Sequence, residues 1–463
     1  MNSSPAVNHI SECFIKPSYT TEELKKPFYL SPWDIAMSSI QYIQKGLLFN
    51  KPPAADHNQE EFIKTFLDKL KHSLSLALVH FYPLSGRLVT QKSEDPHSYI
   101  FFIDCNNSPG AKFIYATLDM KVFDILSPVD VPVIVKSFFD LDRLANHDGH
   151  TNSLLSIQVT ELIDGIFIGC SMNHCVVDGT SYSHFLNTWS EIFQLQAQGQ
   201  EQEISVSISR PPIHNRWFPD GYCRILNLPF KHHDEFISRY ESPELRERIF
   251  HFSAESIAKL KANANAEFNT NKISSFQSLL ALVWKAITRA RHLPHDQMTN
   301  CKLAINNRSR LNPPLPRDYF GNSINVVMAI APAGELLENS LGWAAWKLHL
   351  AVTNHTDKMV REWLQAWLQT PTIYQIAQLA DPYGMIVGSS PRFNMYGNEF
   401  GMGKAVAIRS GYANKLDGNL MAYPGYEGGG SIDLEICLSP DIMRAIESDE
   451  EFMNAVSVSN PLL

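Results

Sequence analysis

Two short runs of strand-forming residues that lead directly into a helical repeat are the feature that most restricts the fold of this chain. Residues 154–159 and 166–170 are apolar and rich in β-formers, and Asp164 with Gly165 supplies a turn signal between them, which predicts a β-hairpin. A helix is predicted next, behind Thr180 as its N-cap, from four apolar residues at helical spacing: Tyr182, Phe185, Trp189 and Ile192. The segment "SMNHCVVDGT" therefore lies between a strand's end and a helix's start.

Strands and helices alternate in both halves of the chain. Residues 60–80 predict an amphipathic helix from apolar residues at four-residue steps: Phe62, Phe66, Leu70, Leu74 and Leu78. The second half begins with a predicted strand at residues 248–252 and a helix capped by Ser253. A more strongly apolar helix is predicted over residues 274–291, so each half carries both kinds of element.

The length of the chain indicates more than one domain. With 463 residues it exceeds one ordinary hydrophobic core, since a domain holds roughly 150 residues. A polar, low-complexity stretch at residues 194–203 is followed by a proline pair, which is typical of an exposed crossover. We therefore predict two main domains, residues 1–203 and 236–463, joined by a crossover segment at residues 204–235.

Composition disfavours several classes of function. Acidic residues outnumber basic ones, 48 to 39, and the net charge of −9 provides no basic field that would attract nucleic acid or an anionic membrane. The N-terminal residues lack the pattern of a secretory signal, and no run approaches the roughly 18 apolar residues of a membrane span, so a cytoplasmic location is expected. The seven cysteines are scattered without paired spacing, which predicts free thiols and neither a disulfide nor a zinc site.

His174 is the residue best placed for acid–base chemistry. An imidazole has an unperturbed pKa of about 6.5 and accepts a proton near neutral pH, and a histidine at the end of a strand would face a cleft. Asp178 follows four residues later and Gly179 comes directly after it, which favours a turn and a structural role for Asp178. The His-x-x-x-Asp pattern alone is a weak signal, because it occurs often by chance.

Other catalytic motifs are incomplete. The segment "GNEFGMGK" has five residues between Gly397 and Gly403 where a phosphate loop has four, and Ala405 stands in place of the required Ser or Thr. Ser171 lies outside a Gly-x-Ser-x-Gly elbow, and the 17 histidines include no His-Glu-x-x-His or comparable ligand spacing. A nucleotide hydrolase, a serine hydrolase and a metal enzyme are therefore disfavoured, and no metal site is predicted.

Several ordered landmarks together resemble the plant BAHD acyltransferase family over nearly the whole chain. The segment "HCVVDG" at residues 174–179 matches the His-x-x-x-Asp-Gly signature of that family. Its N-terminal landmarks are matched by "LSPWD" at residues 30–34 and "YPLSGRL" at residues 82–88, and "RSRLNPPLPRDYFGN" at residues 308–322 is equally characteristic. Correct order and spacing make this combination far more specific than the histidine motif.

The resemblance implies both a fold and an activity. The fold would be α/β, with two similarly sized domains, each a mixed sheet with helices as in chloramphenicol acetyltransferase, and an active-site channel at the domain interface. The protein would be a monomer that takes acyl-CoA as co-substrate and a small molecule as acceptor, with no bound cofactor. His174 would then be the general base for an acceptor hydroxyl or amine, and Asp178 would turn away to hold the loop through an ion pair.

The second signature of the family, Asp-Phe-Gly-Trp-Gly, reads "EFGMG" here, with Gly401 and Gly403 retained. By resemblance, Glu399 replaces an aspartate that pairs with an arginine like Arg308 and braces the domain interface, so this brace is expected to survive. Met402 replaces a tryptophan whose indole N–H helps to hold the oxyanion in some members, and methionine has no such donor. Met402 therefore either weakens acyl transfer or widens the pocket for a bulky acceptor.

Coenzyme A is anionic and needs local hydrogen-bond donors. The start of the helix at residue 274 can supply backbone N–H groups, and the family's donor-end contacts fall in this neighbourhood. We therefore expect Lys272, Ser274 and Ser275 to contact coenzyme A.

Three functions are compatible with the sequence. The first is transfer of an acyl group from acyl-CoA to the hydroxyl or amine of a plant specialised metabolite. The second uses the same pocket and His174 for elimination or cyclisation of one substrate without coenzyme A, and Met402 is the feature that favours it. The third is a non-catalytic ligand-binding or regulatory relative, which the intact His174, Asp178 and Gly179 disfavour.

Overall fold

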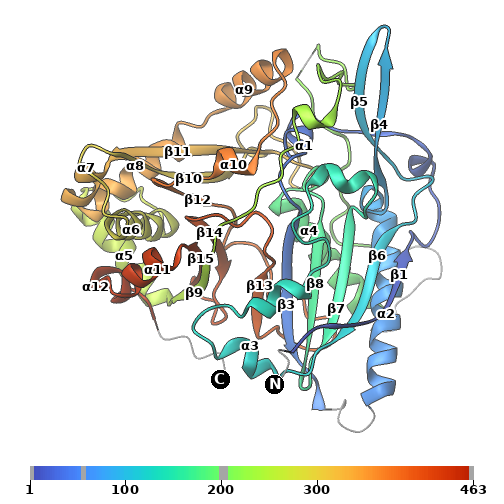
Figure 1. Cartoon of the computed structure of the whole chain (residues 1–463), viewed down its shortest axis with the longest axis horizontal. Coiled ribbons are helices and arrows are strands. Elements are labelled where there is room, and N and C mark those ends of the chain that lie inside the picture. Colours follow the sequence, from blue (N-terminus) through green and yellow to red (C-terminus); the bar gives the residue numbers. More distant parts are fainter. Residues whose placement is uncertain (1–4, 54–58, 198–206, 220, 458–463) are drawn as a thin grey trace.

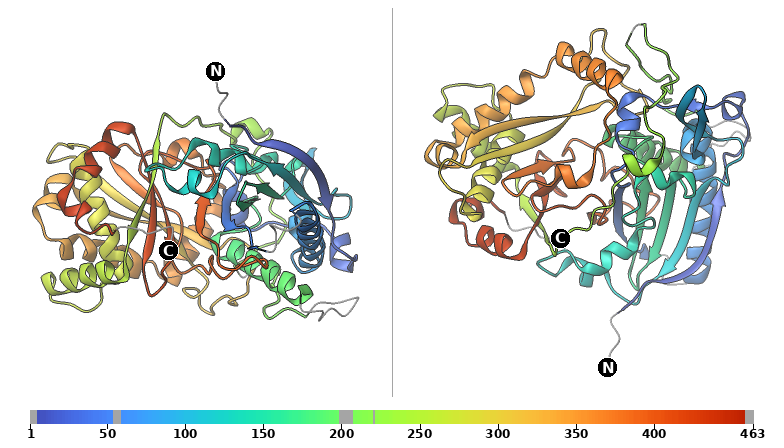
Figure 2. Two further views of the ribbon diagram at one scale, coloured as in Figure 1. Left: turned by 90° about the horizontal axis from the view of Figure 1, so that it is seen from below. Right: turned by 45° about the horizontal axis from the view of Figure 1, so that its top comes forward.

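Two six-stranded mixed sheets form the framework of the chain (Figure 1). The computed structural model describes residues 5–53, 59–197, 207–219 and 221–457. The first sheet lies mostly in the half coloured blue to green and the second in the half coloured yellow to red, and the two halves stay side by side in both views of Figure 2. The α/β fold expected from the sequence is confirmed.

The first sheet is built around the predicted hairpin. Residues 155–161 and 165–172 form two antiparallel strands that are buried along their whole length, which confirms the hairpin. Among the described strand pairs of this sheet, only residues 111–117 and 155–161 run parallel to each other. The strand order is β1 (Asn8–Ile15), β6 (Ala111–Thr117), β7 (Leu155–Glu161), β8 (Gly165–Met172), β3 (Ile43–Asn50) and β13 (Ala407–Ser410).

Two long helices, α2 (Gln59–His80) and α4 (Gly179–Ala197), pack against each other beside this sheet. The indole N–H of Trp189 in α4 donates to Ser73 Oγ in α2 at 3.0 Å, within the core that both helices share with the sheet. The predicted helix over residues 60–80 is thereby confirmed. The predicted N-cap Thr180 is wrong, because Asp178 accepts the first-turn amide of Ser181 at 2.9 Å and α4 already begins at Gly179.

The second sheet has parallel strands at its centre, with β12 (Gly384–Val387) parallel to both β10 (Met298–Asn306) and β14 (Asn419–Pro424). Helices α5 (Ala254–Glu267), α6 (Ser275–Ala290) and α8 (Leu341–Thr353) share one apolar core with it. The predicted cap Ser253 accepts the amide of Ser256 at 3.2 Å, so the predicted strand and both helices of this half are confirmed. The strand order is β11 (Ile324–Pro332), β10 (Met298–Asn306), β12 (Gly384–Val387), β14 (Asn419–Pro424), β15 (Ile432–Leu438) and β9 (Arg246–Phe252).

The remaining elements are mostly short. A small antiparallel sheet has the order β2 (Phe28–Tyr29), β5 (His97–Asp104) and β4 (Arg87–Glu94). Among the described helices, none combines the length and the apolar character that crossing a membrane requires. The other α-helices are α1 (Pro32–Ala36), α3 (Val122–Leu126), α7 (Ala333–Glu338), α9 (Asp357–Gln369), α10 (Ile376–Leu379), α11 (Pro440–Glu447) and α12 (Glu450–Met453).

One strand from the second half of the sequence belongs to the first sheet. Strand β13 pairs antiparallel with β3, so the two sheets do not separate cleanly at the predicted domain boundaries. Parts of the predicted crossover, residues 204–206 and 220, lie outside the described residues. The division into residues 1–203, 204–235 and 236–463 therefore stays a prediction. Strand β13 falls in the third segment by sequence but pairs within the first sheet.

Candidate active site

A cavity of about 360 Å³ lies between the two sheets. Its walls are mostly apolar, as in sites that take small organic ligands. The first half of the chain contributes Lys45, His174, Gly179 and Thr180 to the lining, and the second half contributes Asn306, Ile324, Val387, Asn419 and Met421.

His174 lies in the short connection between the end of β8 and the start of α4, as the sequence predicted. Its backbone N–H donates to Asn146 Oδ1 at 2.7 Å. Asn146 is itself fully buried, and its side-chain amide donates to the backbone carbonyl of Met37 at 2.8 Å. The backbone of His174 is therefore held by the body of the first half.

Asn322 determines which ring nitrogen of His174 carries the proton. The Nδ2 group of Asn322 donates to Asp34 Oδ1 at 2.9 Å and to the carbonyl of His174 at 2.7 Å. Its Oδ1 therefore faces His174 Nδ1, at 3.1 Å, as an acceptor. Nδ1 must donate the proton in this contact, and Nε2 is left as the basic nitrogen of the neutral ring.

Asp34 fixes the orientation of Asn322 in turn. Arg216 Nε lies 2.8 Å from Asp34 Oδ2, and the backbone N–H of Ser31 donates to the same oxygen at 2.9 Å. Because these contacts fully orient a buried carboxylate, the tautomer of His174 is set by a chain of side chains behind it.

The electrostatic environment of His174 favours the neutral ring. Burial lowers the pKa of His174 below its ordinary value of 6.5, although hydrogen bonds and the charge of Asp178 act in the opposite direction. A neutral imidazole with its proton on Nδ1 can accept a proton on Nε2 at neutral pH.

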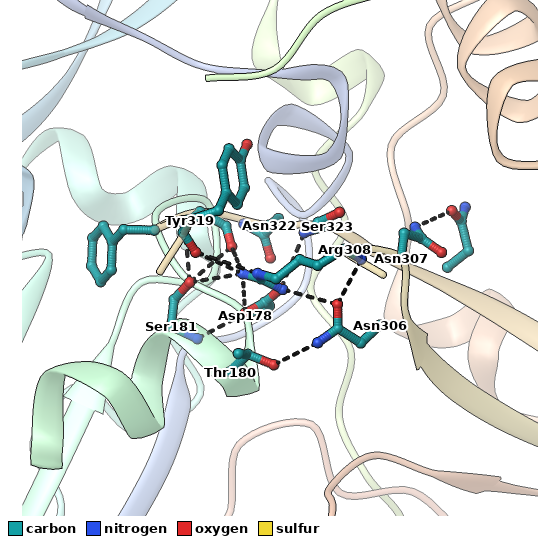
Figure 3. A network of polar contacts seen from close by, with 12 residues as sticks. Asp178, Thr180, Ser181, Asn306, Asn307, Arg308, Tyr319, Asn322 and Ser323 are labelled. Carbon is teal, nitrogen blue, oxygen red and sulfur yellow. Dashed lines mark hydrogen bonds and ion pairs between the residues drawn. The ribbon is translucent and has the colours of Figure 1, made fainter. Parts of the chain in front are cut away.

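Asp178 is not among the described residues that line the cavity, and it pairs with Arg308 (Figure 3). The two guanidinium nitrogens of Arg308 donate to its two carboxylate oxygens at 2.6 and 3.1 Å, and the backbone N–H of Ser323 also donates to Oδ2 at 3.1 Å. Burial alone would raise the pKa of Asp178, but Arg308 and the backbone donors hold it below its ordinary value. The structure thus places Asp178 in a buried ion pair that joins the histidine loop to the second half.

The predicted brace between Arg308 and Glu399 is wrong. Glu399 is exposed, and no ion pair joins it to a residue in the described part of the chain, whereas Arg308 is buried against Asp178. Arg308 also donates to the carbonyls of Gly321 and Tyr319 at 2.8 and 3.2 Å, so its donors are already engaged. The side chain of Glu399 therefore takes no part in the network around Arg308.

The "EFGMG" segment packs against α4, outside the cavity. Phe400 is fully buried, with its ring centroid 4.7 Å from that of Trp189. Gly401 and Gly403 have φ values of +72° and +78°, which glycine adopts without strain, and these turns direct the chain into β13. Met402 is half-buried against the first core and is absent from the described residues that line the cavity, so its predicted place in the pocket is wrong.

Gly179 has a packing reason to be glycine. It begins α4 and lines the cavity, and a Cβ atom there would lie 3.0 Å from the ring of Phe393. The absence of a side chain lets the Phe393 loop approach the N-terminus of α4.

The residues predicted to contact coenzyme A lie together at the N-terminus of α6, away from the cavity lining. Ser274 is the N-cap, and its Oγ accepts the amide of Gln277 at 3.3 Å, while its own N–H donates to Gln277 Oε1 at 2.9 Å. Lys272 is exposed and Ser275 is half-buried.

One buried cluster has the residue types of a metal site but already holds a cation. Glu247, Glu435 and Cys437 bring three potential ligand atoms within 4.8 Å of one another. The ammonium of Lys415 pairs with Glu247 and lies 3.1 Å from Glu435, so it supplies the positive charge that the carboxylates require.

Sequence reasoning missed the residues that orient His174. Asp34 and Asn322 are the last residues of the "LSPWD" and "RSRLNPPLPRDYFGN" landmarks. Their places in these landmarks were a sequence signal that could have identified them as site residues. Thr180 lines the cavity, and its Oγ1 accepts from Asn306 Nδ2 at 3.1 Å, while its O–H donates to no residue in the described part of the chain. Asn146 and Lys45 lie in no sequence motif that would have identified them as site residues.

Comparisons with known proteins agree with this geometry. A family model described as Transferase family matches residues 6–453. An uncharacterized acetyltransferase of Arabidopsis thaliana is 34% identical over 454 residues, covering 96% of this chain and 98% of the relative. Shikimate O-hydroxycinnamoyltransferase of Nicotiana tabacum is 30% identical over 388 residues, covering 82% of this chain and 86% of the relative.

Solved structures share the fold at low sequence identity. The crystal structure of vinorine synthase matches with a TM-score of 0.70 and 20% identity, covering 97% of this chain and 98% of the other. TRI101 of F. sporotrichioides, complexed with coenzyme A and T-2, matches with a TM-score of 0.69 and 15% identity, covering 93% of this chain and 98% of the other. The two-domain, chloramphenicol acetyltransferase-like fold is thereby confirmed.

Proposed function

Because this chain belongs to the Transferase family, the BAHD acyltransferases, and is an acyl-CoA-dependent acyltransferase, we propose that His174 is its general base and that the acceptor is a hydroxyl or amine of a plant specialised metabolite. The observation that carries the proposal is the neutral His174, whose Nδ1 proton is held by Asn322 while the ring lines the cavity between the two sheets.

The proposed reaction needs no acyl-enzyme. Nε2 of His174 takes the proton of the acceptor O–H or N–H, and the acceptor atom attacks the thioester carbonyl carbon. The tetrahedral intermediate then collapses, the C–S bond breaks, and the departing thiolate takes the proton back from His174. The Asp34–Asn322 chain supports this role because it keeps the basic nitrogen on the cavity side of the ring.

Thr180 is the donor that we propose for the oxyanion. Its hydroxyl lines the same cavity as His174 and donates to none of the described residues, while its oxygen accepts from Asn306. A hydroxyl here would supply the interaction that Met402, outside the described lining of the cavity, does not.

Acyl-CoA is the co-substrate, and we propose that Lys272, Ser274 and Ser275 contact its phosphates. Their support is the family resemblance together with the position of all three at the N-terminus of α6, where backbone dipoles favour anions. A cytoplasmic, monomeric protein is part of the same proposal.

Elimination or cyclisation without coenzyme A was favoured by Met402 alone. Since Met402 lies outside the described lining of the cavity, no feature of the site supports this alternative over acyl transfer.

The test is to incubate the purified protein with a panel of acyl-CoA donors and hydroxyl or amine acceptors, and to measure free thiol release together with product mass. Acceptor-dependent thiol release with an acylated product is expected. A product that forms from one substrate without any acyl-CoA would instead support elimination or cyclisation. The His174→Ala protein serves as the control for release that does not depend on the proposed site.

A further inference from the structure

We propose that Lys45 binds a carboxylate on the substrate that occupies the cavity. The proposal rests on the proposed function, because it names the chemical class of molecule that the acyl-transfer site accepts. The carboxylate belongs either to the acceptor or to the far end of the acyl group, and both sources present the same chemistry to the ammonium.

Lys45 is a buried cation that faces the cavity. It lies on β3, is only 7% exposed, and forms part of the same lining as His174. Its Nζ donates to Tyr423 Oη at 3.1 Å and lies 3.9 Å from the weak acceptor Met421 Sδ. An ammonium has three N–H donors, so at least one is left for a ligand in the cavity.

No carboxylate in the described part of the chain forms an ion pair with Lys45. Among the described residues, no ion pair involves Lys45, and the buried carboxylate of Glu435 is engaged with Lys415 at 3.1 Å and with Ser410 Oγ at 2.5 Å. Burial lowers the pKa of Lys45 to about 8, with the charge of Glu435 raising it and that of Lys415 lowering it. Lys45 therefore remains mostly protonated at pH 7 without a direct counter-ion, which is costly unless a ligand supplies one.

An unpartnered side chain on β14 points to the same ligand. Alternate residues of a strand share a face, so Asn419 lies on the face of β14 that presents Met421 and Tyr423 to Lys45. Asn419 lines the cavity, is only 5% exposed, and its buried Oδ1 has no partner among the described residues. An amide oxygen accepts, so Asn419 Oδ1 can take an O–H or N–H donor of the ligand while Lys45 holds the carboxylate.

The apolar remainder of the cavity favours a carboxylate over a more highly charged anion. Its lining includes Ile324, Val387 and Leu416, and Lys45 is the one Lys or Arg among the described lining residues, so the second charge of a phosphate dianion would have no partner. A molecule with an apolar body and one carboxylate suits both parts of the site.

The experiment measures binding by titration calorimetry at pH 7, without turnover, for two matched pairs of probes. The first pair, 4-coumarate and its methyl ester, represents a carboxylate on the acceptor. The second pair, malonyl-CoA and acetyl-CoA, represents a carboxylate on the acyl group. The wild-type protein is expected to bind the acid member of at least one pair about tenfold more tightly than its neutral partner.

Three variants make the result specific to Lys45. Lys45→Met fills similar volume without charge and should remove the preference, whereas Lys45→Arg should keep it. Lys302→Met is the matched control, because Lys302 lies outside the described lining and pairs with Asp381 at 3.2 Å, and it should bind as the wild type does. Thermal unfolding confirms that each variant is folded.

A preference confined to the first pair would assign the carboxylate to the acceptor, and one confined to the second would assign it to the acyl group. If the wild type shows no acid preference in either pair, or if folded Lys45→Met keeps it, the proposal is overturned. Should Lys45→Met fail to fold, protection of wild-type Lys45 from reductive methylation by the preferred acid replaces it, and absence of protection overturns the proposal. None of these measurements depends on His174, so failure of the Lys45 proposal is distinguishable from failure of the proposed acyl-transfer mechanism.

Discussion

Arg308 donates hydrogen bonds to both carboxylate oxygens of Asp178, at 2.6 and 3.1 Å, although the two residues are 130 positions apart in the sequence. Both side chains are almost completely buried, and the pair ties the loop that carries His174 to the segment that follows β10. The ion pair therefore couples the position of His174 to the packing of one half of the molecule against the other.

We expect Asp178→Asn to lower the free energy of unfolding by about 3 kcal/mol, because it removes one charge of a buried pair and leaves the other without a partner. Urea unfolding measures this change. The matched control is Asp441→Asn, whose exposed pair with Arg444 should contribute no more than about 0.5 kcal/mol. Full stability of Asp178→Asn combined with lost turnover would mean that Asp178 acts at the reacting atoms.

His174→Ala should fold normally and lose about 10² to 10⁴ in kcat, since it removes the proton acceptor without touching the pair of Asp178 and Arg308. Steady-state kinetics with the best donor and acceptor of the screen measure the loss. His97→Ala, at an exposed position, should retain the wild-type rate. Near-normal transfer by a folded His174→Ala protein would exclude His174 as the base.

Met402→Trp should change kcat and KM little, for small and bulky acceptors alike. The side chain packs against the first core and is outside the described cavity lining, so a new indole N–H would not reach the reacting atoms. Parallel kinetics with two acceptors of different size are the measurement. A gain in kcat with the small acceptor would show instead that position 402 contacts the transition state.

Local patterns were sufficient to predict many of the elements. The helix expected over residues 60–80 spans Gln59–His80, and the hairpin and the Ser253 cap were found because turn, cap and periodicity signals lie within a few residues of one another. The pairing of β13 with the first sheet could not be predicted from such local patterns. Strand β13 has only four residues, too few to show a periodicity, and its pairing with β3 is decided by packing across most of the chain.

In the candidate site too, local sequence predicted some features, and others depend on packing between distant residues. His174 stood in a recognisable motif, but the choice of Asp178 over Glu399 as the partner of Arg308 depends on which carboxylate the fold buries. Asn322 acquires its role only when the fold brings it between Asp34 and His174. Sequence spacing carries no information about such contacts.

Thr180→Val should lower kcat by about 10²-fold with a smaller change in KM, if its hydroxyl donates to the oxyanion mainly in the transition state. Valine keeps the shape of the side chain, so packing beside Asn306 is preserved. Thr180→Ser is the conservative control and should recover most of the rate. An unchanged kcat for Thr180→Val would assign the oxyanion to another donor.

The pH profile of transfer tests how Asn322 acts on His174. Burial lowers the pKa of His174 below 6.5, and only the neutral ring is a base, so kcat/KM should be flat near pH 7 to 8 and fall as the pH drops through that lowered value. The hydrogen bond to Asn322 Oδ1 favours the charged ring and raises this pKa. Asn322→Leu removes it, so the fall in rate should move to still lower pH.

The same substitution should also reduce the rate on the plateau by about tenfold, because Nδ1 loses its side-chain acceptor and the ring can more readily place its proton on Nε2. The two effects together distinguish a positioning role from simple damage to the site. Damage that admits water would relieve the burial of His174 and raise its pKa toward 6.5, which moves the fall in rate to higher pH. A profile for Asn322→Leu that shifts upward, or a plateau rate equal to that of the wild type, would contradict the assignment of Nε2 as the nitrogen that accepts the proton.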